Sequence, residues 1–250
     1  MMIIESAKNQ KVKDWKKLQT RKGREKAFSY IIEGPHIVEE AAKAEALITE
    51  LIVTEGTELS AYPFKELPVV YTVTEKVMQE LTDTETPQGI MAVCKMVEPE
   101  LPRHGKLLLL DAIQDPGNLG TIIRTADSAG YDGLLLGHGT VDAYNSKVLR
   151  STQGSIFHLP VIKGDLVKEV QKLKEAGMLI YATEVSGGTP YQELDSSSQF
   201  AVILGNEANG VSDELQRLAD VNVYIPIYGN AESLNVAVAA GILMYGLLPS

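Results

Sequence analysis

The sequence predicts an α/β protein in which a mostly parallel sheet lies between helices and follows a smaller α+β domain. From residue 107 onward, short apolar runs alternate with glycine-bearing loops and helical patterns, which is typical of a doubly wound sheet. Before residue 98, β-rich runs are separated by polar or proline-bearing turns. The segment 98–106 combines charges, prolines and a glycine without apolar periodicity, as expected of a linker. We therefore expect domains over 1–98 and 104–250.

The first domain should begin with a basic amphipathic helix. Val12, Trp15 and Leu18 recur at helical spacing and predict a buried face with lysines opposite. The segment 28–44 predicts a short strand, a Gly-Pro turn and a helix. The elements expected after it are strands at 47–54, 67–74 and 89–97, with a helix at 74–82.

The second domain should begin with a strand over 107–113, whose continuous apolar run predicts burial on both faces. A helix from Leu119 to Ala129 follows, and Gly130 is placed to end it. The remaining predicted strands are 133–137, 156–161, 178–184, 200–205 and 221–227, and the predicted helices lie near 145–151, 165–176, 211–219 and 234–248. Polar residues within 115–130, 203–210 and 225–243 should meet at the carboxyl edge of this sheet, where such folds bind ligands.

Composition argues against several classes of protein. The single cysteine, Cys94, rules out an internal disulfide framework, and no basic-then-apolar leader opens the chain. The longest apolar or glycine stretch, 236–248, is shorter than the roughly 20 residues of a membrane span. The histidines are scattered without ligand spacing, so no metal site is expected. Phosphate-binding glycine loops and a serine-hydrolase elbow are also missing. We expect a cytoplasmic protein without a membrane or a metal.

Charge is distributed unevenly along the chain. The formal net charge is −10, but residues 1–26 contain nine Lys and Arg against three Asp and Glu. Charge runs of this kind are most often solvated surface. Nucleic-acid binding therefore needs support from other features of the sequence.

Three motifs supply that support. The first contains Asn118, Gly120, Ile122 and Arg124; the second contains Gly205, Glu207 and Gly210; the third contains Ile225, Pro226, Gly229, Ser233, Leu234, Asn235, Val236 and Ala239. In this order and spacing they resemble the motifs of the SpoU-class RNA 2′-O-ribose methyltransferases of the SPOUT superfamily. Upstream, 24–41 and 86–93 resemble the substrate-binding domain that precedes the catalytic domain in many members. The resemblance covers nearly the whole chain. One departure is Ala208, where a glycine usually follows the glutamate.

The resemblance implies a Rossmann-like parallel-sheet domain with a deep trefoil knot that binds S-adenosylmethionine. By carry-over, the donor contacts are Thr183, Leu204, Gly205, Ile225 and Leu234. Glycine lets the main chain approach a ligand closely, and the three aliphatic side chains offer apolar surface to an adenine. For Leu204, ordinary core packing is an equally good interpretation.

The resemblance also implies a set of catalytic residues, which are Arg124, Asn118, Glu207, Ser233 and Asn235. Arg124 would bind a phosphate and stabilise negative charge on the 2′-oxygen. It would not act as a general base, because a guanidinium keeps its proton at neutral pH. Glu207 would anchor Arg124 or a neighbouring loop. Asn118, Ser233 and Asn235 would orient these groups or simply cap helices.

With this context the basic helix becomes a candidate RNA contact, through Lys13, Lys17, Arg21 and Arg24. We expect an RNA substrate, ribosomal RNA before transfer RNA, and a homodimer formed through the catalytic domain. Two alternatives remain open. One is a catalytically silent RNA-binding protein of the same fold, and the other is an ordinary doubly wound enzyme that binds NAD or ATP.

Overall fold

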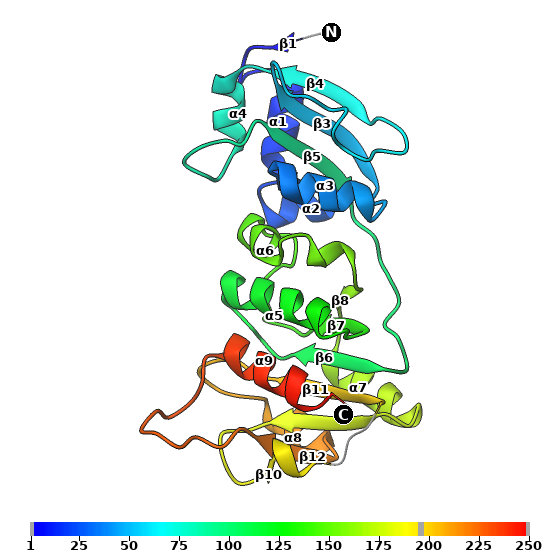
Figure 1. The fold of residues 1–250 in the computed structure, drawn as a ribbon, viewed down its shortest axis with the longest axis vertical. Coiled ribbons are helices and arrows are strands. Elements are labelled where there is room, and N and C mark those ends of the chain that lie inside the picture. The colour runs from blue at the N-terminus through cyan, green and yellow to red at the C-terminus, as the bar shows by residue number, and fades with distance from the viewer. Residues whose placement is uncertain (1–2, 195–197, 249–250) are drawn as a thin grey trace. The chain divides into compact units, whose positions relative to one another are not determined.

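The computed structural model describes residues 3–194 and 198–248, and the chain divides into two compact units (Figure 1). Unit 1 comprises Met1–Val97 and Tyr144–His158, and unit 2 comprises Glu98–Ala143 and Leu159–Ser250. The first boundary lies where the linker was expected. The segment 144–158, which we assigned to the second domain, instead packs within unit 1.

Unit 1 contains a five-stranded sheet in the order β1-β4-β3-β5-β2. Its strands are β1 (Ile3–Ile4), β2 (Ser29–Glu33), β3 (Ile48–Thr54), β4 (Val69–Val73) and β5 (Ile90–Lys95). Its helices are α1 (Gln10–Lys17), α2 (Arg21–Ala27), α3 (Pro35–Lys43), α4 (Glu75–Leu81), α6 (Ser146–Thr152) and the short 3₁₀ helix η1 (Ser155–Phe157). β5 runs antiparallel to β2 and β3, whereas β4 runs parallel to β1 and β3.

Apolar side chains cover both faces of this sheet. On one face, Val12 and Trp15 of α1 and Val77 of α4 pack in one cluster with Ile52 and Met91 of the sheet. A second cluster contains Leu51 and Ala92, the neighbours of Ile52 and Met91 along their strands, together with side chains of α3 and Leu149 of α6. Because neighbouring side chains of a strand point to opposite faces, the two clusters cover the two sides of the sheet. Tyr144, Ile156 and Phe157 pack against the second cluster together with Leu149, which is why 144–158 belongs to unit 1.

The described part of unit 2 contains a parallel sheet of seven strands in the order β10-β12-β9-β11-β6-β7-β8. The strands are β6 (Lys106–Leu110), β7 (Gly133–Leu136), β8 (Val161–Lys163), β9 (Leu179–Thr183), β10 (Thr189–Pro190), β11 (Phe200–Leu204) and β12 (Val221–Tyr224). The helices are α5 (Pro116–Ser128), α7 (Leu166–Glu175), α8 (Asp213–Leu218), α9 (Val236–Gly246) and the 3₁₀ helix η2 (Tyr191–Glu193). α5 and α9 pack against each other (Figure 1).

The predicted strand at 156–161 is wrong in its position. Gln153 and Gly154 adopt positive φ angles of 50° and 97° and end α6, and the apolar residues that follow form η1. The strand β8 begins only at Val161, directly after Pro160. Of the run 156–161 only Leu159 is buried and most of the other residues are half-buried, so the apolar run indicated partial burial and not the type of element.

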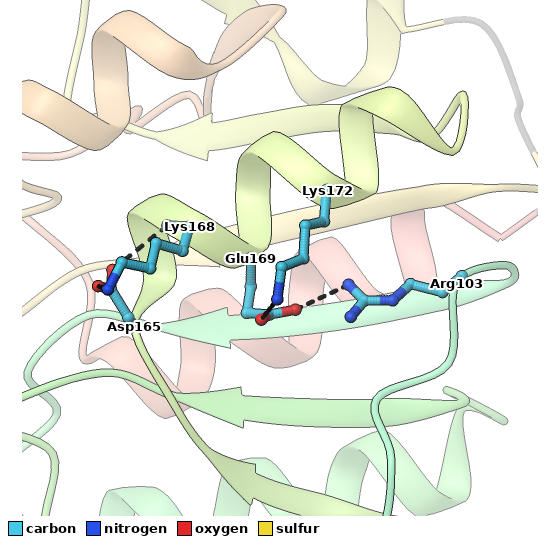
Figure 2. A network of polar contacts seen from close by, with 5 residues as sticks. All are labelled: Arg103, Asp165, Lys168, Glu169 and Lys172. Carbon is cyan, nitrogen blue, oxygen red and sulfur yellow. Dashed lines mark hydrogen bonds and ion pairs between the residues drawn. The ribbon is translucent and has the colours of Figure 1, made fainter.

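Charged side chains anchor the start of unit 2 to α7 (Figure 2). Glu169 lies between two cations and accepts hydrogen bonds of 2.7 Å from both Arg103 and Lys172. Asp165 caps the same helix and pairs with Lys168 at 3.2 Å. Burial raises the pKa of Glu169, but the bonds from Lys172 and Arg103 outweigh it, so that the pKa lies below its usual value.

None of the helices in 3–194 and 198–248 is long and apolar enough to cross a membrane. Within the same residues, no cluster of three His, Cys, Asp or Glu side chains is arranged to hold a metal ion.

Candidate functional site

A pocket of about 500 Å³ lies at the carboxyl ends of β9, β11 and β12 in unit 2. Its volume falls within the range of small-molecule sites, roughly 300 to 1,000 Å³. The five residues expected to contact a donor all line it: Thr183, Leu204, Gly205, Ile225 and Leu234. Leu204 is also fully buried, so core packing and pocket lining are both roles of this side chain. The sheet edge predicted from the sequence is therefore where the pocket lies.

The electrostatic character of the pocket favours a cationic ligand. Glu184, Glu207 and Glu232 line it, and no lysine or arginine is among the described lining residues. A nucleotide polyphosphate needs the opposite surroundings, namely cations or a glycine-rich run of amides. S-adenosylmethionine has a positively charged sulfonium and an adenosine without phosphate. The pocket therefore fits this donor and disfavours NAD or ATP.

Gly205 brings two stretches of main chain into close contact beside the pocket. A Cβ atom at this position would lie 2.0 Å from the carbonyl carbon of Gly210 and 2.1 Å from the nitrogen of Val211. Asn206 and Gly210 close the loop with two main-chain hydrogen bonds of 3.0 and 2.8 Å. Only glycine leaves room for this approach.

Two further residues, missed in the sequence analysis, fasten this loop to the segment after β6. The Asp111 carboxylate accepts a hydrogen bond from the Ser212 amide at 2.9 Å. The Asn206 side chain donates to the Ala112 carbonyl at 2.8 Å and accepts from the Ala208 amide at 2.9 Å. Ala112 has a φ of 59°, which is uncommon for a residue with a Cβ. The only signal in the sequence was the position of Asn206 between Gly205 and Glu207.

The three motifs meet at Asn118. Its Nδ2 donates to Oε1 of Glu207 at 2.7 Å, and its Oδ1 accepts from Nδ2 of Asn235 at 3.1 Å. One side chain from each motif therefore forms a continuous hydrogen-bonded chain. The bond to the Glu207 carboxylate is charge-assisted, and such bonds are roughly twice as strong as neutral ones.

The expected capping role is confirmed at Asn235 and is wrong at Asn118. Asp115 caps α5 by accepting from the Asn118 amide at 2.8 Å, so Asn118 lies inside the first turn and is not the cap. Asn235 does cap α9, with its Oδ1 bonded to the amides of Ala237 and Val238. Ser233 lies two residues before this cap, exposed and lining the pocket.

Arg124 lies on the exposed side of α5, between Asn118 and the end of the helix. Of the two anchoring partners expected for Glu207, Arg124 donates no bond to it among the described residues; the Glu207 carboxylate accepts from Asn118 in the first turn of α5 instead. Arg124 is not among the residues that line the pocket. Its guanidinium makes no hydrogen bond or ion pair with any residue that the structure describes, and its catalytic role stays a prediction.

The four candidate RNA contacts of unit 1 differ in accessibility. Lys13 is exposed and has no side-chain partner in the described chain. Lys17 and Arg21 are exposed but pair with Asp14 at 2.7 Å and Glu25 at 2.8 Å.

Arg24 corrects one of our expectations. It is only 4% exposed, and its guanidinium donates to the carbonyls of Leu18 and Gln19 at 3.0 and 2.9 Å. These bonds join α2 to the end of α1, so Arg24 serves the packing of unit 1 and is not available to a phosphate.

Comparison with known proteins agrees with this geometry. The model of the SpoU rRNA Methylase family matches residues 105–245, and that of the MRM3-like substrate binding domain matches residues 9–92. The chain is 52% identical to the 23S rRNA (guanosine(2553)-2′-O)-methyltransferase RlmP of Bacillus subtilis over 247 residues, covering 99% of both chains. It is 32% identical to an uncharacterized tRNA/rRNA methyltransferase of Synechocystis, covering 97% of this chain and 92% of that one.

Two solved structures containing the donor are similar throughout. The AdoMet-bound rRNA methyltransferase from Sinorhizobium meliloti has a TM-score of 0.90 and 31% identity, covering 98% of this chain and 97% of that chain. The SpoU methyltransferase AviRb from Streptomyces viridochromogenes, in complex with AdoMet, has a TM-score of 0.86 and 27% identity, covering 96% and 97%. The motifs, the parallel-sheet fold and these matches together show that the chain belongs to the SpoU rRNA methylase family.

Proposed function

We propose that this chain transfers a methyl group from S-adenosylmethionine to a ribose 2′-hydroxyl of ribosomal RNA, and that 23S rRNA is the substrate. The observation that carries the proposal is the pocket with three carboxylates and no described cation, beside the Asn118–Glu207–Asn235 chain. The 52% identity to a 23S rRNA 2′-O-methyltransferase over nearly the whole chain supports the choice of RNA.

The donor, when bound, supplies an electrophilic methyl group on a cationic sulfur. Leu204, Ile225 and Leu234 provide apolar surface for the adenine, and the Glu184, Glu207 and Glu232 carboxylates balance the positive charge. The close approach at Gly205 brings main-chain groups to the pocket wall. The pocket therefore orients the donor, which lowers the entropic cost of reaction.

A ribose 2′-hydroxyl must lose its proton as it attacks, and negative charge develops on its oxygen. Arg124 stabilises that charge and holds a neighbouring phosphate, because a guanidinium stays protonated and donates in a planar fork. The proton leaves to a phosphate oxygen or to water. Asn118, held by Glu207 and Asn235, fixes the first turn of α5 and thereby the helix that bears Arg124.

RNA is held in part by unit 1, through the exposed side chains of Lys13, Lys17 and Arg21. The match to a substrate-binding domain over residues 9–92 supports this assignment. Because phosphate contacts position RNA without reading its sequence, the basic segment contributes affinity more than specificity. A cytoplasmic location, a homodimer formed through unit 2 and a trefoil knot at its carboxyl edge complete the proposal.

The test is a transfer assay with the full chain, S-adenosylmethionine carrying a labelled methyl group, and unmodified transcripts of 23S rRNA, 16S rRNA and tRNA. We expect label in 23S rRNA, on a nucleotide that becomes resistant to alkaline cleavage on its 3′ side. Mass spectrometry of RNA from cells with and without the gene should show the same site. Label in tRNA alone would move the substrate to tRNA, and donor binding without transfer to any RNA would favour a silent RNA-binding protein.

A further inference from the structure

The loop between β12 and α9 carries an aromatic side chain that no described residue of unit 2 covers. Tyr228 is 92% exposed, whereas the other exposed large hydrophobic residues of the described chain are 37% to 61% exposed. It has no hydrogen bond, ring contact or cation contact with any described residue. In Figure 1 this loop is the orange segment that extends beyond the sheet.

The position of Tyr228 is defined by its neighbours in the chain. Ile227 lines the donor pocket, and so do Glu232, Ser233 and Leu234 further along the same loop. Tyr228 does not line the pocket. It therefore occupies the rim, on a segment that leaves the pocket wall at Ile227 and returns to it at Glu232.

This rim is where the substrate nucleotide has to lie. A 2′-oxygen that attacks a methyl group must come within about 3.5 Å of it, so the nucleotide that carries it, or an adjacent one, stands at the mouth of the pocket. Single-stranded RNA is commonly recognised by stacking of unpaired bases on aromatic side chains.

We propose that Tyr228 is a stacking platform for a nucleobase of the substrate RNA, at or next to the methylated nucleotide. This inference rests on the proposed function and adds a binding residue to it. The residues beside Tyr228 favour a base over a protein partner, because Gly229, Asn230 and Ala231 are small or polar and exposed. A single aromatic ring among small residues offers a contact surface the size of one base, whereas a protein–protein interface needs a larger apolar core.

The experiment compares Tyr228→Ala and Tyr228→Phe with the unchanged full chain, and uses Tyr245→Ala as the matched control. Tyr245 is also in unit 2 and is 55% exposed, but it lies on α9 and does not line the pocket. For each protein we would measure the KM for a 23S rRNA transcript, the Kd for S-adenosylmethionine by calorimetry, the Tm and the sedimentation coefficient.

Stacking of one base contributes enough that its loss should raise the KM for RNA by about 5-fold to 100-fold in Tyr228→Ala. Tyr228→Phe retains the ring and should stay within about threefold of the unchanged protein. The Kd for the donor, the Tm and the sedimentation coefficient should not change in either variant, and Tyr245→Ala should retain its KM for RNA.

Three results would overturn the inference. An unchanged KM for RNA in Tyr228→Ala would show that Tyr228 does not stack on a base. A loss of donor affinity alongside the loss of RNA affinity would show that Tyr228 belongs to the donor site. A change in sedimentation makes it a contact between two copies of the chain. If the unchanged protein transfers no methyl group to RNA, the proposed function fails instead, and RNA affinity measured by fluorescence anisotropy still decides whether Tyr228 contacts a base.

Discussion

Asn118 and Glu207, which lie 89 positions apart in the chain, are joined by a 2.7 Å hydrogen bond from the amide nitrogen to the carboxylate. This bond fixes the first turn of α5 against the loop that follows β11. Because the same amide accepts from Asn235, a change at Asn118 disturbs all three motifs together.

Exchanging the amide and the carboxylate tests this bond. Asn118→Asp alone brings two carboxylates together, and we expect kcat/KM for RNA to fall about 100-fold, since like charges at this distance repel strongly. The Asn118→Asp, Glu207→Gln double variant restores a donor opposite an acceptor and should recover at least about tenfold. Steady-state transfer assays measure both. A double variant that is no better than Asn118→Asp would show that the bond does not position the site.

Arg124 should matter for catalysis and not for stability. Because its side chain is exposed, Arg124→Ala should leave the Tm and the donor Kd unchanged, while kcat falls by about 10² to 10³, as when one charge-stabilising donor is removed. Arg124→Lys retains the charge without the planar fork and should recover little. Near-full activity of Arg124→Lys in a single-turnover assay would contradict the need for a guanidinium.

Gly205→Ala should weaken donor binding. The added Cβ would lie 2.0 Å from the main chain of Gly210, so the loop that lines the pocket must shift, and we expect the Kd for S-adenosylmethionine to rise at least about tenfold by calorimetry. Gly241→Ala is the control. Gly241 lies in α9, and a Cβ there would approach only the side chain of Thr125, at an ordinary contact distance of 3.8 Å. Equal donor affinity in the two variants would mean that the loop yields without cost.

Substitutions at Arg24 and Lys13 should have different effects, the first on stability and the second on RNA binding. Arg24→Ala leaves two carbonyls without their buried donor and should lower the free energy of unfolding by about 1 to 3 kcal/mol in urea. Lys13→Ala should leave stability unchanged and weaken RNA binding severalfold, with the slope of log K against log salt reduced by about 0.7 to 0.9. RNA binding that is lost in Arg24→Ala at full stability would restore Arg24 as a phosphate contact.

Acid should weaken the anchor between the linker and α7. The pKa of Glu169 lies below its usual value, so its contribution is present above the unfolded-state pKa and is lost as the pH falls through the folded-state pKa. The unfolding free energy of the unchanged protein should fall between about pH 5 and pH 3. In Glu169→Gln this fall should be smaller, by less than about 1 kcal/mol, because the glutamine does not titrate. Glu175→Gln, on an exposed position of the same helix, should leave the pH profile unchanged. Identical profiles for all three proteins would show that the network contributes no stability.

Local patterns predicted the elements of this fold well where they reflect burial. Most of the continuous apolar run that begins at Leu107 lies in β6, an interior strand of the described parallel sheet, and the polar motifs do follow strand ends. Local patterns predicted less reliably where the residues that a segment packs against are far away in the sequence. Ile156 and Phe157 look like a strand but pack as a 3₁₀ turn within unit 1.

The site shows the same division. The residues of the pocket wall were predicted through the resemblance of the three motifs to the SpoU-class enzymes, and all five of them line the pocket. The bonding pattern was not, since the partner of Glu207 depends on which strands become neighbours. Arg24 shows the same limit for charge, because a basic run does not reveal which of its side chains turns inward.

The segment 144–158 makes the chain pass between the two units three times, near residues 97, 143 and 158. The gene therefore does not divide into two coding halves. A fragment that starts at residue 98 would retain α6 without the strands that bury Leu149, and an expressed catalytic half would expose that leucine and aggregate more readily than the intact protein. Transplanting either unit onto a relative requires two joined pieces of chain rather than one cut.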